Sequence, residues 1–337
     1  MIPEGKVLVV GCGSIGRRHI RNFQSLGVKN FILCDTSEEN LKLASMGLEA
    51  PVLTTNFKNA LVNAPSMAVI CTPSSLHLEM ACELVRGKVH VLIEKPLSDT
   101  LDGVTELEKL VDEKGVVAMM AMCYRFHPIF REVKKILGAG TIGKVYHVNY
   151  FGGHYLPDWH PKADYRIEYA ARKTLGGGVI LTSIHGLDNI RWLFGEVEEA
   201  YAFVDRVSGL EMDVEDLATA IFRLKNGIYV NWQTDFIQRA NQHRMVVAGS
   251  NGTLRVDFIT GVIETYSAVT GKWSSETHSF EINEMYVVEA RHFLESVEKK
   301  KTPVADVKDG HRTLRLALAV KGSRNLLEER PGTCRTA

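Results

Sequence analysis

Short apolar runs alternate with amphipathic segments at the start of the chain. The runs Val7–Val10 and Phe31–Cys34 contain no polar residue, which is typical of strands buried on both faces of a parallel sheet. Between them, apolar positions recur at helical spacing over residues 15–26. This pattern predicts a strand, a helix and a second strand within the first 35 residues.

The same alternation continues to residue 122. It predicts further helices over 38–45, 76–86 and 101–114, and further buried strands over 67–71, 89–93 and 116–122. Strands that are joined by helices run parallel. We therefore expect an α/β domain over residues 1–122, built on a doubly wound parallel sheet.

After residue 144 the pattern changes to short β-rich runs with turn residues between them. Asn226-Gly227 and Asn251-Gly252 are strong hairpin signals, and hairpins join antiparallel strands. We expect seven strands, over 145–150, 198–204, 217–224, 228–235, 245–249, 253–258 and 262–266. The second domain, residues 123–337, is thus predicted to be α+β with a large, open-faced, mainly antiparallel sheet.

Few helices accompany these strands. We expect one over 178–194, one over 284–299 and one over 309–329 that can pack on either domain, whereas 330–337 is expected to be disordered. One face of the sheet then remains uncovered, and a large apolar patch on a monomer favours self-association. We expect a homodimer or homotetramer that forms through this face.

A glycine-rich turn separates the first strand from the first helix. It contains Gly11, Gly13, Ser14, Ile15 and Gly16. Glycines at this spacing permit a tight turn and let the backbone approach a pyrophosphate, which the helix N-terminus also attracts. The sequence predicts that these residues bind a dinucleotide.

The second strand ends at an acidic residue, Asp35. At about 20 residues beyond the last glycine, a carboxylate accepts hydrogen bonds from the adenosine ribose and repels a 2′-phosphate. The predicted cofactor is therefore NAD, and NADP is disfavoured.

Two later strands deliver residues to the same edge of the sheet, where open α/β sheets bind their ligands. Thr72, Pro73 and His77 follow one of these strands, and Glu94 and Lys95 follow the other. We expect all five to border the cofactor, with Lys95 aimed at the reacting group.

Composition excludes several other classes of function. Lys plus Arg equals Asp plus Glu at 40 each, so no excess charge indicates nucleic acid or an anionic membrane as a partner. No apolar stretch approaches the roughly 20 residues of a membrane span, and the start lacks a signal peptide, so a cytoplasmic protein is expected. The six cysteines show no C-x-x-C spacing, and no metal site is predicted.

Three segments together resemble the Gfo/Idh/MocA oxidoreductase family: Glu94-Lys95-Pro96, TPSSLH at 72–77 and GGGVILTSIHGLD at 176–188. The resemblance covers essentially the whole chain. It implies a Rossmann domain, an open-faced sheet domain and NAD(P)-dependent dehydrogenation of sugars, inositols or nucleotide sugars. It also implies that Lys95 is the catalytic lysine and that His185 is the histidine of the family.

The chemistry of these two side chains agrees with that role. Oxidation of a secondary alcohol needs a base for the hydroxyl proton, and a histidine with a pKa of about 6.5 suits this task. Lys95 can stabilise negative charge on the oxygen, or take the proton itself if its pKa is lowered. Which of the two accepts the proton stays open, as does the alternative of a helix-face histidine and a solvated lysine.

The sequence departs from the family at one position. Many members carry an aspartate one turn before the histidine, where this chain has Leu181 and Thr182. Asp188, one turn after His185, can orient the imidazole instead. We assign Thr182, Asp188 and Arg125 to substrate binding. The missing carboxylate keeps open the alternative of a non-catalytic, NAD-binding sensor or regulatory protein.

A long connection, residues 154–175, is rich in aromatic and basic residues. Tyr155 and Trp159 can stack on a sugar or base, and Arg166 and Arg172 can bind a carboxylate or phosphate. The connection resembles that of family members in acidic-sugar and surface-polysaccharide biosynthesis. It can alternatively serve as an arm across a subunit interface. We predict a dehydrogenase of a nucleotide-activated or acidic sugar.

Overall fold

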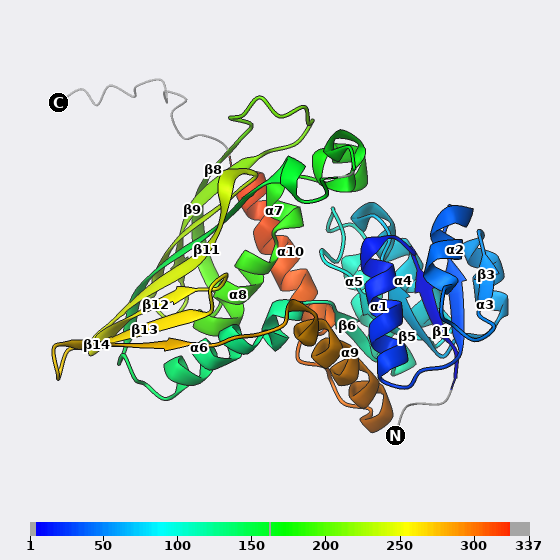
Figure 1. Ribbon diagram of the computed structural model, residues 1–337, viewed down its shortest axis with the longest axis horizontal. Helices are drawn as coiled ribbons and strands as arrows, with labels where there is room; N and C mark the ends of the chain where they lie inside the picture. The colour runs from blue at the N-terminus through cyan, green and yellow to red at the C-terminus, as the bar shows by residue number, and fades with distance from the viewer. Residues whose placement is uncertain (1–4, 162, 324–337) are drawn as a thin grey trace, which may run out of the picture.

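The computed structural model describes residues 5–161 and 163–323, and two β-sheets organise its two halves (Figure 1). The first sheet has six parallel strands in the order β3-β2-β1-β4-β5-β6. Its strands are β1 (Val7–Val10), β2 (Phe31–Cys34), β3 (Val52–Thr54), β4 (Met67–Ile70), β5 (His90–Ile93) and β6 (Ala118–Met120). The predicted doubly wound Rossmann sheet is confirmed.

Helices lie on both faces of this sheet. They are α1 (Ser14–Ser25), α2 (Glu38–Ser45), α3 (Phe57–Val62), α4 (His77–Arg86) and α5 (Val104–Lys114). The strand order reverses between β2 and β4, on either side of β1, which places the glycine turn after β1 at the topological switch point. The sequence analysis missed β3 and α3, because β3 is short and only partly buried.

The second sheet has eight strands in the order β14-β13-β12-β11-β7-β10-β9-β8. These are β7 (Val145–Tyr155), β8 (Val197–Asp205), β9 (Leu217–Leu224), β10 (Tyr229–Asp235), β11 (Ile237–Gly249), β12 (Gly252–Asp257), β13 (Val262–Ser267) and β14 (Lys272–Thr277). Only the β7–β10 pair is parallel, so the predicted mainly antiparallel sheet is confirmed.

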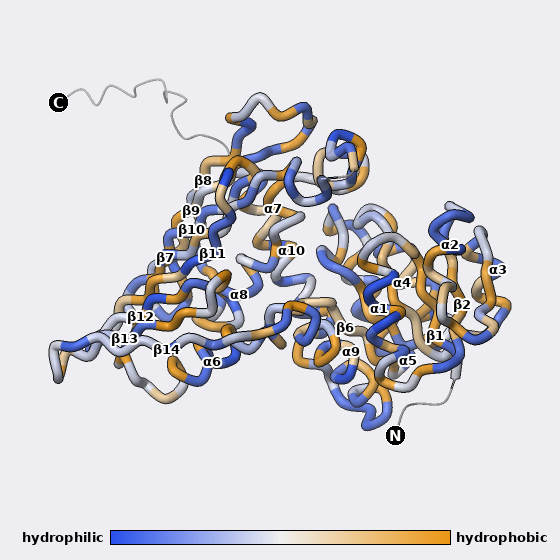
Figure 2. The backbone as a smooth tube through the Cα atoms, viewed as in Figure 1, coloured by the Kyte–Doolittle hydropathy of each residue, from blue (hydrophilic) through white to orange (hydrophobic). Residues whose placement is uncertain are grey.

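Both predicted hairpin turns join neighbouring antiparallel strands, β9 to β10 and β11 to β12. Exposed and buried positions alternate along the first four residues of β10, whereas Figure 2 shows hydrophobic and hydrophilic segments mixed through both halves of the molecule. The eighth strand, β14, was missed because all six of its residues are exposed and it has no buried apolar face.

The predicted helix over 178–194 is interrupted. It forms α7 (Val179–Thr182) and α8 (His185–Phe194). The Gly186 N–H binds the carbonyl of Ser183, and the Thr182 carbonyl accepts a hydrogen bond from the Lys95 ammonium at 2.9 Å instead. The end of α7 is thus bonded to Lys95, which lies in the loop after β5 of the first sheet.

Three further helices complete the fold: α6 (Pro128–Gly138), α9 (Ile282–Lys299) and α10 (Val307–Lys321). The helix α9 packs on α1, where Phe293 meets Phe23 edge to face at 6.2 Å. The helix α10 lies between the halves and contacts β8 and β6 (Figure 1). The predicted extension of this helix over 324–329 and the predicted disorder of 330–337 lie outside the described residues.

None of the helices in the described ranges is long and apolar enough to cross a membrane.

Candidate active site

The glycine turn after β1 is tight at two positions and open at the third. A Cβ on Gly11, whose φ is +88°, would lie 2.5 Å from the Cys71 carbonyl oxygen, and one on Gly16 would lie 1.9 Å from the Gly11 carbonyl oxygen. At Gly13 a Cβ would meet nothing within 4 Å. Ser14 and Ile15 then begin α1, and Ser14 is exposed. The open position fits the close approach of a pyrophosphate.

Asp35 stands beside this turn at the end of β2. Its carboxylate accepts hydrogen bonds from the Cys12 N–H at 2.7 Å and the Ser37 N–H at 2.8 Å, and from the Asn40 amide. These donors hold the carboxylate against the turn. The residues present therefore fit the adenosine side of a dinucleotide.

Thr72 and Pro73, after β4, are partly buried at the same edge, but His77 is not available to a ligand. Its ring is 1% exposed, and its two nitrogens each lie 2.8 Å from a carbonyl oxygen, one of Thr72 and one of Pro96. This corrects the predicted cofactor contact. His77 instead joins the loop after β4 to the loop that carries Lys95.

Glu94 is also bound within the protein. Its carboxylate lies 2.8 Å from Nε2 of His19, which is fully buried on α1. Burial alone would raise the pKa of Glu94, but the hydrogen bond and charge of His19 lower it. The Glu94 carboxylate also accepts a hydrogen bond from the Lys95 N–H at 3.2 Å, so its charge lies close to Lys95.

Lys95 reaches from the first half of the molecule to the second, where its ammonium donates to the Thr182 carbonyl. Burial acts to lower the pKa of Lys95, but Tyr169 and Glu94 more than offset it, and the pKa is raised. The lowered pKa that proton acceptance by Lys95 would need is thus absent. Tyr169 belongs to the long connection, whose tyrosines the sequence suggested for stacking on a ligand rather than for contact with Lys95.

His185 begins α8 and faces the same pocket as Lys95. Its ring stacks on Tyr124 at 4.6 Å, and its Nε2 lies 3.7 Å from the Cys123 sulfur. Burial, followed by the charge of Lys95, lowers the pKa of His185 to about 4. The imidazole is therefore neutral near pH 7.

A pocket of about 510 Å³ opens where these side chains meet. Tyr150 and His243 line it, and the Tyr150 hydroxyl oxygen lies 2.6 Å from His243 Nε2. The Trp159 ring, which also lines the pocket, stacks on the His154 ring with 4.3 Å between the ring centroids. Within the described part of the chain, no aspartate or glutamate lines this pocket. Its one formal charge is the positive charge of Lys95.

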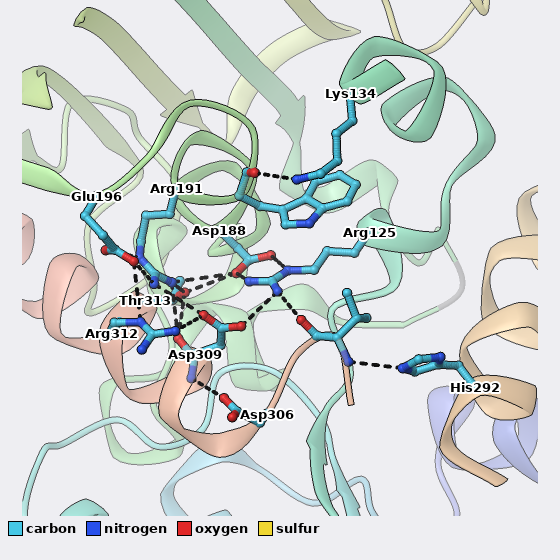
Figure 3. Close-up of polar contacts among 12 residues, drawn as sticks. Arg125, Lys134, Asp188, Arg191, Glu196, His292, Asp306, Asp309, Arg312 and Thr313 are labelled. Carbon is cyan, nitrogen blue, oxygen red and sulfur yellow. Dashed lines mark hydrogen bonds and ion pairs between the residues drawn. The ribbon is translucent and has the colours of Figure 1, made fainter. Parts of the chain in front are cut away.

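Arg125 and Asp188 bind each other behind this pocket (Figure 3). Two hydrogen bonds of 2.8 and 2.7 Å join them, and a second carboxylate, that of Asp309 on α10, lies 3.0 Å from the same guanidinium. The side chains of Arg125 and Asp188 are only 3% and 2% exposed. This corrects two predictions: Arg125 and Asp188 do not line the pocket, and Asp188 turns to Arg125 rather than to the imidazole of His185.

The long connection contributes less to the pocket than predicted. Arg166 binds Asp164 at 2.8 Å and is 47% exposed, and Tyr155 packs beneath the Arg239 guanidinium at 3.7 Å. Arg172 is partly buried. Of the four predicted residues in this connection, only Trp159 lines the pocket. Thr182 also lines it, and its hydroxyl has no hydrogen-bond partner among the described residues.

Two family models match the chain in succession. Residues 5–122 match the oxidoreductase family with an NAD-binding Rossmann fold, and residues 130–255 match the GFO/IDH/MocA C-terminal domain. The chain is also similar to myo-inositol 2-dehydrogenase from Thermotoga maritima, with 27% identity over 342 residues, 96% of this chain and 97% of the relative.

Solved structures share the fold over almost the full length. Levoglucosan dehydrogenase in complex with NADH and levoglucosan has a TM-score of 0.84 and 19% identity, over 94% of this chain and 96% of that chain. The WlbA dehydrogenase from Bordetella pertussis in complex with NADH and UDP-GlcNAcA has a TM-score of 0.79 and 23% identity, over 95% and 96% of the two chains.

Proposed function

Because this chain belongs to the Gfo/Idh/MocA family of oxidoreductases, we propose that it is an NAD-dependent dehydrogenase that acts on a secondary alcohol of a sugar. The observation that carries this proposal is the pairing of Lys95 and His185 in one pocket, at the carboxyl edge of the Rossmann sheet. The Thermotoga relative is an inositol dehydrogenase, which supports a polyhydroxylated substrate.

Each side chain has one task in this reaction. NAD, when bound, supplies the acceptor for the hydride that leaves the carbinol carbon. Neutral His185 takes the hydroxyl proton, and the Lys95 ammonium stabilises the negative charge that develops on the oxygen as it becomes a carbonyl. The raised pKa keeps Lys95 protonated and the lowered pKa keeps His185 neutral near pH 7, which are the starting protonation states that this division of roles needs.

The lining of the pocket supports an acidic or nucleotide-activated sugar. A pocket with one ammonium and no carboxylate attracts an anionic substrate, and aromatic side chains such as Trp159 offer faces for a sugar ring or base. The WlbA structure contains UDP-GlcNAcA, a ligand of this chemical kind.

Asp35 supports NAD over NADP, since its carboxylate would repel a 2′-phosphate. Nicotinamide fluorescence titrations test this preference. Asp35→Ala should lower the ratio of the NADP dissociation constant to the NAD dissociation constant by about tenfold. This corresponds to the loss of about 1.4 kcal/mol of discrimination between the two cofactors. Tighter binding of NADP than of NAD by the wild type would contradict the assignment.

Thr182 motivates a second candidate, a non-catalytic NAD-binding sensor, because it stands where many relatives carry an aspartate. The two candidates make opposite predictions for a panel of nucleotide sugars and free acidic sugars, followed by the NADH absorbance. A dehydrogenase oxidises at least one of them, and Lys95→Ala lowers that activity by about 10²-fold or more. A sensor binds NAD and turns over none.

The uncovered face of the second sheet supports a homodimer or homotetramer. Helices cover the face that is turned toward the first half (Figure 1), whereas Tyr201, Phe203, Ile221 and Tyr229 are each more than 50% exposed on neighbouring strands. An exposed apolar patch of this kind marks an interface. Light scattering should give at least twice the monomer mass, and Phe203→Glu with Ile221→Glu should reduce it to that of the monomer.

A further inference from the structure

A second concave surface, which we name the rear groove, lies on the other side of η2 (Cys123–Phe126) from the catalytic pocket. Tyr124 faces the pocket, whereas its neighbours Arg125 and Phe126 line the groove, and no residue lines both. The rear groove has a volume of about 560 Å³, within the range of small-molecule sites. It runs between α6 and α9.

Basic side chains dominate the rim of the rear groove. Arg131, Lys134 and Lys135 come from α6 and Arg291 from α9, and the one acidic residue in the lining is Glu295. The chain as a whole has equal numbers of basic and acidic residues, so this excess is local.

Some of these charges already have partners. Lys135 pairs with Glu132 at 3.1 Å, Glu295 pairs with Lys299 at 3.2 Å, and Arg125 is held by Asp188 and Asp309. Across residues 5–161 and 163–323, no ion pair engages the three that remain, which are Arg131, Lys134 and Arg291. Three cations that form no ion pair within 4 Å among the described residues thus border one groove, although Arg291 interacts electrostatically with Glu295.

Lys134 is held in place without a carboxylate. Its ammonium lies 4.2 Å above the Trp192 ring and donates to the Trp192 carbonyl at 2.9 Å (Figure 3). Burial, and then repulsion by Arg125, lowers the pKa of Lys134. An anion in the rear groove would relieve that repulsion.

We propose that the rear groove is a second binding site, for a small phosphate ester with a flat apolar group. Two arginines and a lysine match a doubly charged phosphate better than a single carboxylate. The rest of the lining suits the apolar group: Phe126, Trp192, Val288 and Val304. Because the groove shares no lining residue with the catalytic pocket, its ligand is not the sugar that is oxidised.

Calorimetric titration of the NAD-saturated, full-length protein with phenyl phosphate tests this site. The wild type should bind it saturably and more tightly than inorganic phosphate, which lacks the ring. Arg131→Gln with Arg291→Gln should weaken binding about tenfold or more, since two charge-assisted hydrogen bonds are lost. Trp192→Leu should remove the advantage of phenyl phosphate over inorganic phosphate.

A matched control is Lys109→Gln with Arg315→Gln, which removes two exposed charges outside the groove. It should change the affinity less than twofold, as should Lys95→Ala. Three results would overturn the proposal: no saturable binding to the wild type, equal weakening in the control, which would indicate general surface charge, or loss of binding in Lys95→Ala, which would place the phosphate in the catalytic pocket.

Discussion

Two buried polar clusters lie on either side of η2, and they differ in how completely their groups are paired. In the cluster of Arg125, Asp188, Arg191 and Asp309, each charge faces an opposite one, and Thr313 donates to Asp188 at 3.1 Å. In the catalytic cluster, the Thr182 hydroxyl and His185 Nδ1 have no partner in the described part of the chain. Paired buried groups hold a fold together, whereas unpaired ones are available to a ligand.

The largest effect that this comparison predicts is on stability. Asp188→Ala leaves Arg125 buried with one of its two carboxylate partners, and should lower the free energy of unfolding by about 3–5 kcal/mol. Urea unfolding measures it. Glu199→Ala breaks the exposed pair with Arg223 and serves as a control that should cost at most about 1 kcal/mol. Similar losses in the two variants would contradict the distinction between the clusters.

In the catalytic cluster, which consists of Lys95, Thr182 and His185, substitution should affect turnover. Lys95→Ala removes the cation beside the reacting oxygen and should lower turnover by about 10²-fold or more, with NAD affinity nearly unchanged. Steady-state kinetics and NAD titration measure both quantities. Lys109→Ala, an exposed lysine on α5, controls for loss of charge. Full activity of Lys95→Ala on any substrate of the wild type would refute the assignment of Lys95.

His185 should make stability depend on pH. The unfolded imidazole takes a proton below pH 6.5, whereas burial keeps the folded one neutral down to about pH 4. The unfolded state therefore binds more protons in this window, and stability falls as the pH is lowered from 6.5 to 4. His185→Gln should remove about 3 kcal/mol of that fall. Parallel stability curves for the two proteins over this window would show that the histidine is not buried as described.

The smallest effect is expected at Arg166. The sequence predicted that this residue binds substrate, but it is paired with Asp164 and half exposed. Arg166→Ala should therefore change the Michaelis constant less than threefold. A tenfold rise would show that the long connection moves onto the substrate and that the catalytic cluster extends beyond the pocket.

The glycine turn and the position of Asp35 could be predicted because their signals are local. The glycine turn and Asp35 lie within one strand-helix-strand unit, and their spacing carries the geometry. The substrate side could not be predicted in the same way. Tyr150 and His243 meet only because β7 and β11 pair, and the partner that Asp188 binds lies 63 residues earlier in the chain. Long-range pairing of this kind leaves no periodic trace in the sequence.

The return of α9 to the first half has a consequence for the order in which the protein is made. Met285, Phe293 and Leu294 fill the same core as Val7, and the Ala305 carbonyl binds the N–H of Met120 at the edge of the first sheet. A ribosome that has completed all six strands of that sheet has made only about a third of the chain. Until α9 emerges, the nascent Rossmann half exposes an apolar face. Exposed apolar surface of this kind makes a nascent chain prone to aggregation and is what chaperones bind.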